Sequence, residues 1–226
     1  TATSSDGLTW TNDQAITQVG STVIDNSSSS NWNRGSYGPA DVLYNPSGTA
    51  TITEPVDEAS VFANKFVMYY DGTTGGTESI GLAVSNDGIN WQGYNGGAAP
   101  VLAGAGTGNW DATYVSRCTV EKVDPDTYHM WYSGGDGRMD HGIGYASSAD
   151  GIAWTRDSAS IFHKDDGVAW RANRTYTPVV IGEHMWFTGK SNAGVYAVGH
   201  AVPEPATMGL LALGGLGVLR RRRKRL

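Results

Sequence analysis

The amino-acid sequence predicts an all-β fold built from repeated four-stranded units, and three observations carry that prediction. Gly contributes 31 of the 226 residues, and Trp and Tyr contribute 8 and 11. Short apolar runs end at Gly, Asp or Asn, and no long stretch shows the period of an amphipathic helix. The same succession of segments also recurs along the chain. Strands joined by tight turns are typical of such a sequence.

The clearest element of the repeat is an Asp-Gly-x-x-Trp sequence. It occurs at residues 6–10, 87–91 and 150–154. Gly accepts a positive φ without steric cost, and an Asp carboxylate can accept hydrogen bonds from backbone N–H groups just after it. We therefore expect these Asp residues to shape turns and to take no part in catalysis.

Three further strands precede this turn in each unit. A strand of small residues comes directly before the turn, at 79–85 and 142–148, with its third copy at 194–200. An aromatic strand comes before that one, at 66–71, 128–133 and 184–188. The first strand of each unit follows a Trp, which is Trp32, Trp110 or Trp170. Four-stranded units repeated around an axis are the blades of a β-propeller. The sequence therefore predicts a β-propeller domain over residues 1–201, with about three blades present.

The two ends of this array do not match. The third unit stops at Ala201, before its Asp-Gly-x-x-Trp element, whereas the chain begins with that element. Either the N-terminal strand completes the last blade and closes a ring, or it is the end of an earlier blade. Propellers have roughly four to eight blades, so we favour a fragment of a longer propeller.

The C-terminal segment carries three ordered signals. Pro203, Glu204 and Pro205 form a Pro-Glu-Pro motif, residues 206–219 contain no charge, and Arg220–Arg225 is a block of positive charge. The uncharged stretch predicts a short hydrophobic helix that reaches the membrane, with the basic end on the cytoplasmic side. It is shorter than the ~20 residues of a full crossing, which favours a signal that is cut over a permanent anchor.

This segment, residues 202–226, resembles a PEP-CTERM sorting signal. The resemblance implies an exported protein that an exosortase-type enzyme processes near the Pro-Glu-Pro motif. It also implies transient passage through the inner membrane and delivery to the cell surface or extracellular matrix of a Gram-negative bacterium.

The charge balance excludes one class of partner. The whole chain has a net charge of −6, and the residues before Pro203 hold 10 basic and 21 acidic side chains. A domain with this excess of negative charge should repel nucleic acid, so we exclude nucleic acid as a ligand. Cys118 is the single cysteine, so no internal disulfide can form, and we expect it to be buried and inert.

The sequence pattern at Met130–Thr155, echoed at Met68–Trp91, resembles the five-bladed propellers of the arabinanase, β-xylosidase, levansucrase and invertase superfamily of glycosidases. The resemblance covers most of residues 31–201. It implies a role with carbohydrate, either as a binding protein or as a degenerate glycosidase. An active glycoside hydrolase with further catalytic residues in absent blades, and a structural surface or biofilm protein without activity, remain alternatives.

Glycoside hydrolysis requires two carboxyl groups that face each other across the sugar. The resemblance implies that they lie on the innermost strands, where Asp41 and Asp111 are the catalytic candidates and Glu121 is a further carboxylate. It also implies an acid Glu before Pro178, but Thr177 occupies that position, which argues against hydrolysis. A structural role for Asp41 and Asp111 remains open.

Five further side chains are candidates for ligand binding. Arg117 and Arg174 lie on predicted inner strands, where a buried charge needs a partner. We expect either an ion pair with Asp41 or Asp111, or an anionic ligand. The other three candidates are the repeated residues Trp32, Trp110 and Trp170, which could stack on sugar rings or pack within the blades.

The sequence gives no motif for a metal site. The five His residues share no ligand spacing. The acidic loops at Asp165–Asp166 and 135–138 could hold calcium but lack the spacing of an EF-hand, so we expect solvated loops and no cofactor.

Overall fold

The computed structural model describes residues 4–9, 11, 17–18, 32–33, 36–52, 56, 58–137 and 139–202. These residues are mostly β-structure, in agreement with the predicted all-β class. Short 3-10 helices are found at η1 (Glu58–Ala63), η2 (Asn95–Gly97) and η3 (Ala169–Arg171). Within this part of the chain, no helix has the length and hydrophobicity needed to span a bilayer. The predicted C-terminal helix and the Pro-Glu-Pro motif lie outside the described residues.

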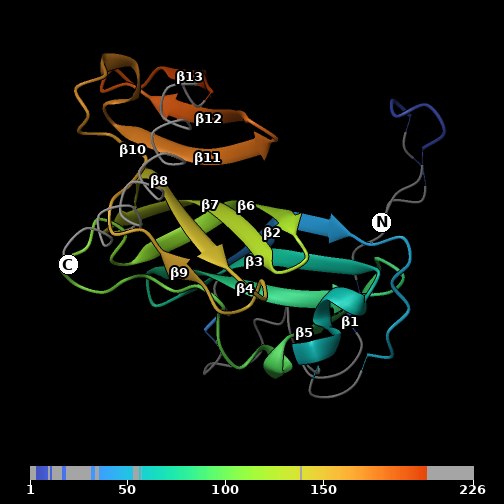
Figure 1. Ribbon diagram of the computed structural model, residues 1–226. Coiled ribbons are helices and arrows are strands. Elements are labelled where there is room, and N and C mark those ends of the chain that lie inside the picture. Colours follow the sequence, from blue (N-terminus) through green and yellow to red (C-terminus); the bar gives the residue numbers. More distant parts are fainter. Residues whose placement is uncertain are drawn as a thin grey trace, which may run out of the picture.

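The strands form three successive antiparallel units (Figure 1). The first contains β2 (Ser36–Tyr44), β3 (Phe66–Thr74), β4 (Thr77–Ser85) and β5 (Asn90–Gly93). The second contains β6 (Tyr114–Asp124), β7 (Thr127–Asp136), β8 (Met139–Ser148) and β9 (Thr155–Arg156), and β10 (Phe162–His163) also pairs with β8. The third contains β11 (Arg174–Ile181), β12 (His184–Lys190) and β13 (Tyr196–Ala201). The short strand β1 (Thr17–Gln18) runs parallel to β5.

Neighbouring units pack face to face. A single parallel bridge between Glu78 and Tyr114 connects the first unit to the second, and β11 of the third unit lies across β6, β7 and β8 (Figure 1). Tyr69 and Leu82 of the first unit share a buried apolar cluster with Met130 of the second. The core is therefore built between units as well as within them.

Repeated Trp and Gly residues explain the packing inside each unit. The indole of Trp110 stacks on Tyr132, and a Cβ added at Gly144 would lie only 2.8 Å from that indole. Trp32 lies in the same way over Gly81, and Trp170 over Gly199. A side chain larger than Gly would displace these rings because protein interiors are close-packed.

The Asp-Gly turns also repeat in atomic detail. Asp87 Oδ1 accepts hydrogen bonds from the N–H groups of Ile89 and Asn90, at 2.8 and 2.7 Å. The same two bonds recur after Asp150 and after Asp6. The backbone bonds lower the pKa of Asp87 to about 2. These carboxylates shape turns, as the sequence predicts.

Candidate functional site

The first strand of each unit is interrupted by a β-bulge. The shifts in register fall between Pro39 and Asp41, between Ser116 and Thr119, and between Tyr176 and Val179. Arg117 and Thr177 lie in the second and third bulges with φ of +48° and +50°. Non-Gly residues in this left-handed region are uncommon, and such strain persists where surrounding contacts hold it, frequently at functional sites.

The second and third bulges connect their units to the unit before. The N–H of Arg117 donates to Asp71 Oδ1 on β3, and the N–H of Thr177 donates to Ser133 Oγ on β7, both at 2.8 Å. Asp71 and Ser133 hold the same place in their units, just before a Gly that is covered by the unit's Trp. The strained residues are therefore fixed by contacts between units.

A cluster of charged side chains surrounds Asp140 on β8. The Asp140 side chain is fully buried and accepts hydrogen bonds from Arg117 Nη1, at 2.8 Å, and from Arg174 Nη2. The guanidinium carbons of the two Arg lie 5.9 and 4.8 Å from the ring centre of Tyr176. The expected internal ion pair exists, but its acid is Asp140 and not Asp41 or Asp111, because the β7–β8 hairpin brings Asp140 to the first strands of two units.

Asp71 and Glu78 add two further carboxyl groups to this cluster, which we call the Asp140 cluster. Burial raises the pKa of Asp71 to about 7, although the N–H and the charge of Arg117 act against the shift. Burial also raises the pKa of Glu78, and the charge of Asp140 adds to that increase. At neutral pH the carboxyl group of Asp71 is therefore only partly ionised.

Several buried polar atoms of this cluster lack a hydrogen-bond partner among the described residues. They are Glu78 Oε2, Asp140 Oδ1 and Arg174 Nε. Buried polar groups are almost always paired with protein, water or ligand. The three atoms, together with the partly exposed side chain of Arg117, make this Asp140 cluster the best candidate for a binding site.

The two predicted catalytic residues lie in other surroundings. Asp41 Oδ2 accepts the N–H of Val120 at 2.7 Å, which joins β2 to β6. Asp111 is buried, and its Oδ2 accepts from Arg156 Nη1 at 2.7 Å and from the hydroxyl of Tyr132 at 3.0 Å. Both carboxylates therefore make internal contacts that stabilise the fold, and they hydrogen-bond to different partners.

The three Trp residues that are candidates for ligand binding pack within their own units. Trp32 donates its indole N–H to the carbonyl of Gly97 at 2.8 Å and packs on Tyr70. Trp170 packs on Phe187 in the third unit and is 36% exposed. Together with the stacking of Trp110, these contacts give each ring a structural role.

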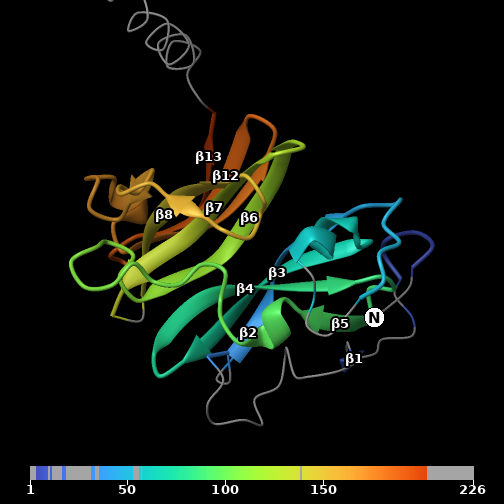
Figure 2. The same ribbon diagram turned by 60° about the horizontal axis from the view of Figure 1, so that its bottom comes forward.

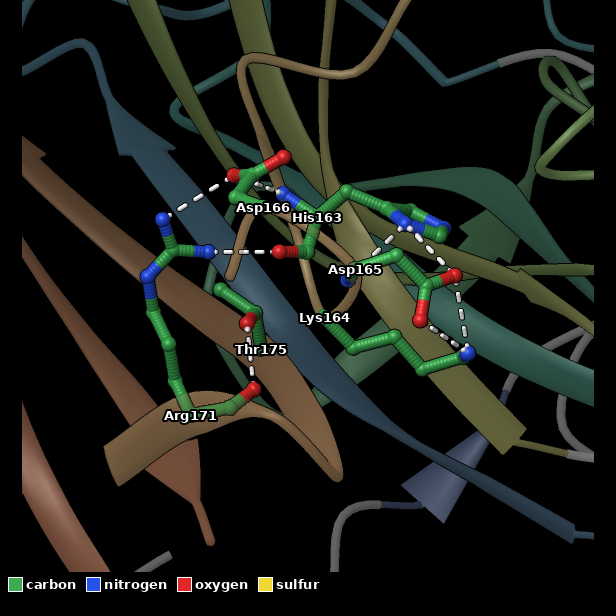
Figure 3. A network of polar contacts seen from close by, with 6 residues as sticks. All are labelled: His163, Lys164, Asp165, Asp166, Arg171 and Thr175. Atoms are coloured by element: carbon green, nitrogen blue, oxygen red, sulfur yellow. Dashed lines mark hydrogen bonds and ion pairs between the residues drawn. The ribbon is translucent and has the colours of Figure 1, made fainter. Parts of the chain in front are cut away.

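The acidic loop at Asp165–Asp166 is neutralised by neighbouring cations (Figure 3). Asp166 Oδ2 accepts from Arg171 Nη2 at 2.9 Å and from the N–H of His163 at 2.8 Å. Asp165 pairs with Lys164 Nζ at 2.8 Å. Across the described ranges, no group of three or more His, Cys, Asp or Glu residues is arranged to hold a metal ion.

Sequence reasoning missed the acidic members of the Asp140 cluster, namely Asp71, Glu78 and Asp140. One signal was available: Asp71 occupies the position that Ser133 and Thr188 hold in the other units. A charged residue that interrupts a repeat of uncharged ones indicates a local role. Nothing in the sequence indicates that Asp140 would meet two Arg from separate strands.

Comparison with known proteins identifies the C-terminal segment. Residues 201–224 match the PEP-CTERM protein-sorting motif. The chain carries a PEP-CTERM sorting motif. The match begins one residue before the predicted boundary and includes Pro203, Glu204 and Pro205. Among curated proteins, none matches this chain.

Several solved structures of enzymes that act on glycosides are similar to the chain. A family 117 glycoside hydrolase from Zobellia galactanivorans shares 19% identity, with a TM-score of 0.47, over 74% of this chain and 52% of that one. A GH32 β-fructofuranosidase from Bombyx mori shares 20%, with a TM-score of 0.45, over 62% of this chain and 31% of that one. A β-1,2-mannobiose phosphorylase from Listeria innocua shares 15%, with a TM-score of 0.43, over 62% and 37%. This chain spans about half of the first of these proteins and less of the other two.

Proposed function

We propose that this chain belongs to an exported propeller protein that binds a saccharide at the Asp140 cluster. The observation that carries the proposal is the set of unpaired buried atoms at Glu78, Asp140 and Arg174. Sugar hydroxyl groups both donate and accept hydrogen bonds, so they can satisfy a carboxylate oxygen and a guanidinium N–H at one site. The resemblance of the repeat to glycosidase propellers favours carbohydrate among polar ligands.

Binding is favoured over hydrolysis by the state of the carboxylates. Asp41 and Asp111 are held by internal hydrogen bonds, and Asp140 is held by two guanidinium groups. Hydrolysis would require an acid and a base free to face a sugar. Thr177, at the position where the resemblance implies the acid, carries no carboxyl group.

One observation supports a second candidate, an active glycoside hydrolase. The pKa of about 7 for Asp71 would let this residue donate a proton near neutral pH, as a general acid must. A second carboxylate would then act as base or nucleophile. Glu78 or a residue of a further blade would supply it.

The three units are further proposed to be blades of a propeller longer than this chain, with five blades in all. The packing of three successive antiparallel units against one another supports this assignment. The sorting motif supports cleavage near Pro203–Pro205 by an exosortase-type enzyme, followed by release to the cell surface or matrix. Mature protein whose mass still includes Arg220–Arg225 would contradict cleavage.

A glycan array tests the binding proposal. The purified chain should bind a defined set of glycans, and Arg174→Gln should weaken that binding by about tenfold or more, because a hydrogen bond to a charged group contributes about 1.5–3 kcal/mol. Lys122→Gln is the matched control, since Lys122 is an exposed cation outside the cluster. Thermal unfolding of both variants would show that they fold.

Three other outcomes separate the alternatives. Cleavage of a bound glycan that is lost in Asp71→Asn would favour the hydrolase. Equal binding by Arg174→Gln and Lys122→Gln would place the ligand elsewhere. Absence of binding to any neutral or acidic glycan would contradict the proposal and favour a structural surface protein.

A further inference from the structure

The charged side chains of the Asp140 cluster lie at different depths. The side chains of Arg117 and Arg174 are 38% and 25% exposed, whereas the side chain of Asp140 is fully buried. Oε2 of Glu78 is buried as well. A ligand that approaches the cluster from solvent therefore meets two guanidinium groups before it meets a carboxylate.

The two guanidinium groups share one acceptor. Arg117 Nη1 and Arg174 Nη2 both donate to Oδ2 of Asp140. A guanidinium group has five N–H donors in a planar fork. Within the described part of the chain, Asp140 is the one acceptor for the side chain of either Arg. Several of their donors therefore remain for a ligand.

The packing of the units holds the two Arg residues in place. Arg117 lies on β6 and Arg174 on β11, the first strands of the second and third units, and Figures 1 and 2 both show these two units side by side. Both guanidinium carbons lie within 5.9 Å of the ring centre of Tyr176, and the face of an aromatic ring attracts a cation. The backbone N–H of Arg117 is held by Asp71. A site that is ordered in advance loses less entropy when a ligand binds.

We infer that the saccharide bound at the Asp140 cluster is acidic, and that a carboxylate or sulfate group of the sugar is held by Arg117 and Arg174. The inference rests on the proposed function, because it names the class of saccharide for the same site. Guanidinium groups bind carboxylates through two parallel N–H···O bonds, and such charge-assisted bonds are roughly twice as strong as neutral ones. An anionic group also provides the pair of cations with a further counter-ion, which a neutral sugar does not.

The excess of negative charge on the domain does not exclude an acidic sugar. Charges in solvent are screened over about 8 Å at physiological ionic strength, so distant carboxylates act weakly on a group that contacts two guanidinium groups. Nucleic acid differs because it carries a phosphate at every nucleotide and is bound through many cations. One acidic sugar in a mostly neutral glycan needs only this pair. We therefore expect sparsely charged glycans to be preferred over uniformly charged ones.

Proton uptake should accompany the binding of an acidic sugar. Asp71 on β3 lies among Arg117, Glu78 and Asp140, and burial raises its pKa to about 7. Burial also raises the pKa of Glu78, which lies near both Arg residues and Asp140. A bound anion adds negative charge beside these two carboxyl groups and should raise both pKa values further. Binding should therefore tighten about fivefold as the pH falls from about 8 to about 6, through partial uptake of one proton.

A glycan array with paired probes tests the class of saccharide. It displays oligosaccharides that contain one glucuronic or galacturonic acid, the same oligosaccharides after reduction of the carboxyl group to an alcohol, and sulfated glycans with their unsulfated partners. We expect the chain to bind acidic members and to bind their neutral partners about tenfold more weakly, because the charge-assisted bonds are lost.

The array separates failure of this inference from failure of the proposed function. Equal binding to both members of each pair, or binding to neutral glycans alone, would overturn the acidic class and leave a saccharide site in place. Binding to no glycan would contradict the proposed function itself. Inorganic sulfate is a further probe, and affinity for sulfate equal to that for the acidic glycan would overturn the assignment to a saccharide.

A pair of variants tests the role of the cations. Arg117→Gln should reduce the preference for the acidic member of a pair about tenfold. Lys122→Gln removes an exposed cation outside the cluster and should leave that preference unchanged. The preference is a ratio of two affinities of one protein, so a smaller folded fraction does not alter it. An unchanged ratio in Arg117→Gln would place the acidic group elsewhere.

Calorimetry measures proton uptake in the unmodified chain. The acidic oligosaccharide that binds best on the array is titrated near neutral pH in two buffers of different ionisation enthalpy. The difference between the two binding enthalpies gives the number of protons taken up, which should be positive for the acidic glycan and smaller for its neutral partner. Tight binding of the acidic glycan without proton uptake would contradict an anion beside Asp71 and Glu78.

Discussion

Each unit has a sheet face that is equivalent in the other two units, and the three equivalent faces lie in different environments. Equivalent cross-strand pairs mark this face: Tyr69 with Leu82, Trp131 with Tyr145, and Trp186 with His200. The first pair is buried under the second unit, the middle pair is partly buried under the third, and Trp186 is 39% exposed. Burial of this face is therefore determined by whether another unit covers it.

The residues on this face change with their exposure. The first unit presents Leu82, whereas the third presents His200, whose Nε2 lies 2.9 Å from His184 Nδ1. Trp186 stacks on both imidazole rings. Amphipathic rings tolerate partial exposure better than aliphatic side chains. Each unit therefore provides the surface on which the next one packs.

The largest expected effect comes from the contact between the second and third units. Asp140→Asn removes the buried carboxylate that pairs with both guanidinium groups, which should lower the free energy of unfolding by about 3 kcal/mol or more. Urea unfolding measures the change, with Asp124→Asn as an exposed control. A loss equal to that of the control would show that the third unit does not depend on this ion pair.

The Trp–Gly contacts offer a comparison within equivalent positions. Gly144→Ala places a Cβ against both Tyr132 and Trp110 in the buried second unit, and should cost about 1–3 kcal/mol. Gly199→Ala places a Cβ against Phe187 and Trp170, and should cost less because Trp170 is 36% exposed and can move outward. Both values come from urea unfolding. A larger cost at Gly199 would contradict the view that the third unit is less constrained.

Asp71 makes the stability of the first unit depend on pH, whereas the other two units have no titratable side chain at the equivalent position. Its pKa is raised from 3.8 to about 7, so the folded protein binds the proton more tightly than the unfolded chain. The contribution of Asp71 to the free energy of unfolding is fully present below about pH 4. It decreases by about 1 kcal/mol per pH unit as the pH rises to about 7.

Asp71→Asn should remove this slope, as measured by urea unfolding at a series of pH values. Thr188→Ala, at the equivalent position in the third unit, should leave the slope unchanged because the residue does not titrate. An unchanged slope in Asp71→Asn would show that other groups dominate the pH dependence.

The smallest effect concerns the turns. Asp87→Ala removes two backbone hydrogen bonds at the entry to β5 and should cost about 1 kcal/mol. Asp6→Ala removes the same bonds from an exposed turn and should not measurably change the stability of the monomer. Thermal unfolding at low concentration compares them. Equal losses would mean that the N-terminal turn packs on the body as the others do.

Much of the architecture followed from the sequence because its signals are local. The Asp-Gly-x-x-Trp spacing predicted turns at Asp6, Asp87 and Asp150, and alternating apolar runs predicted the strands that follow one another in each unit. Three signals in a fixed order likewise predict the sorting segment. Each of these features depends on residues close together along the chain.

The tertiary structure alone decided the site. Asp140, Arg117 and Arg174 meet because a hairpin of the second unit lies beside the first strands of two units, and no spacing along the sequence encodes that approach. Asp41 and Asp111 looked catalytic by position, but their nearest hydrogen-bond donors come from β6 and from Arg156. The sequence determined which surfaces each unit carries, and the stacking of the units determined which charges were buried together.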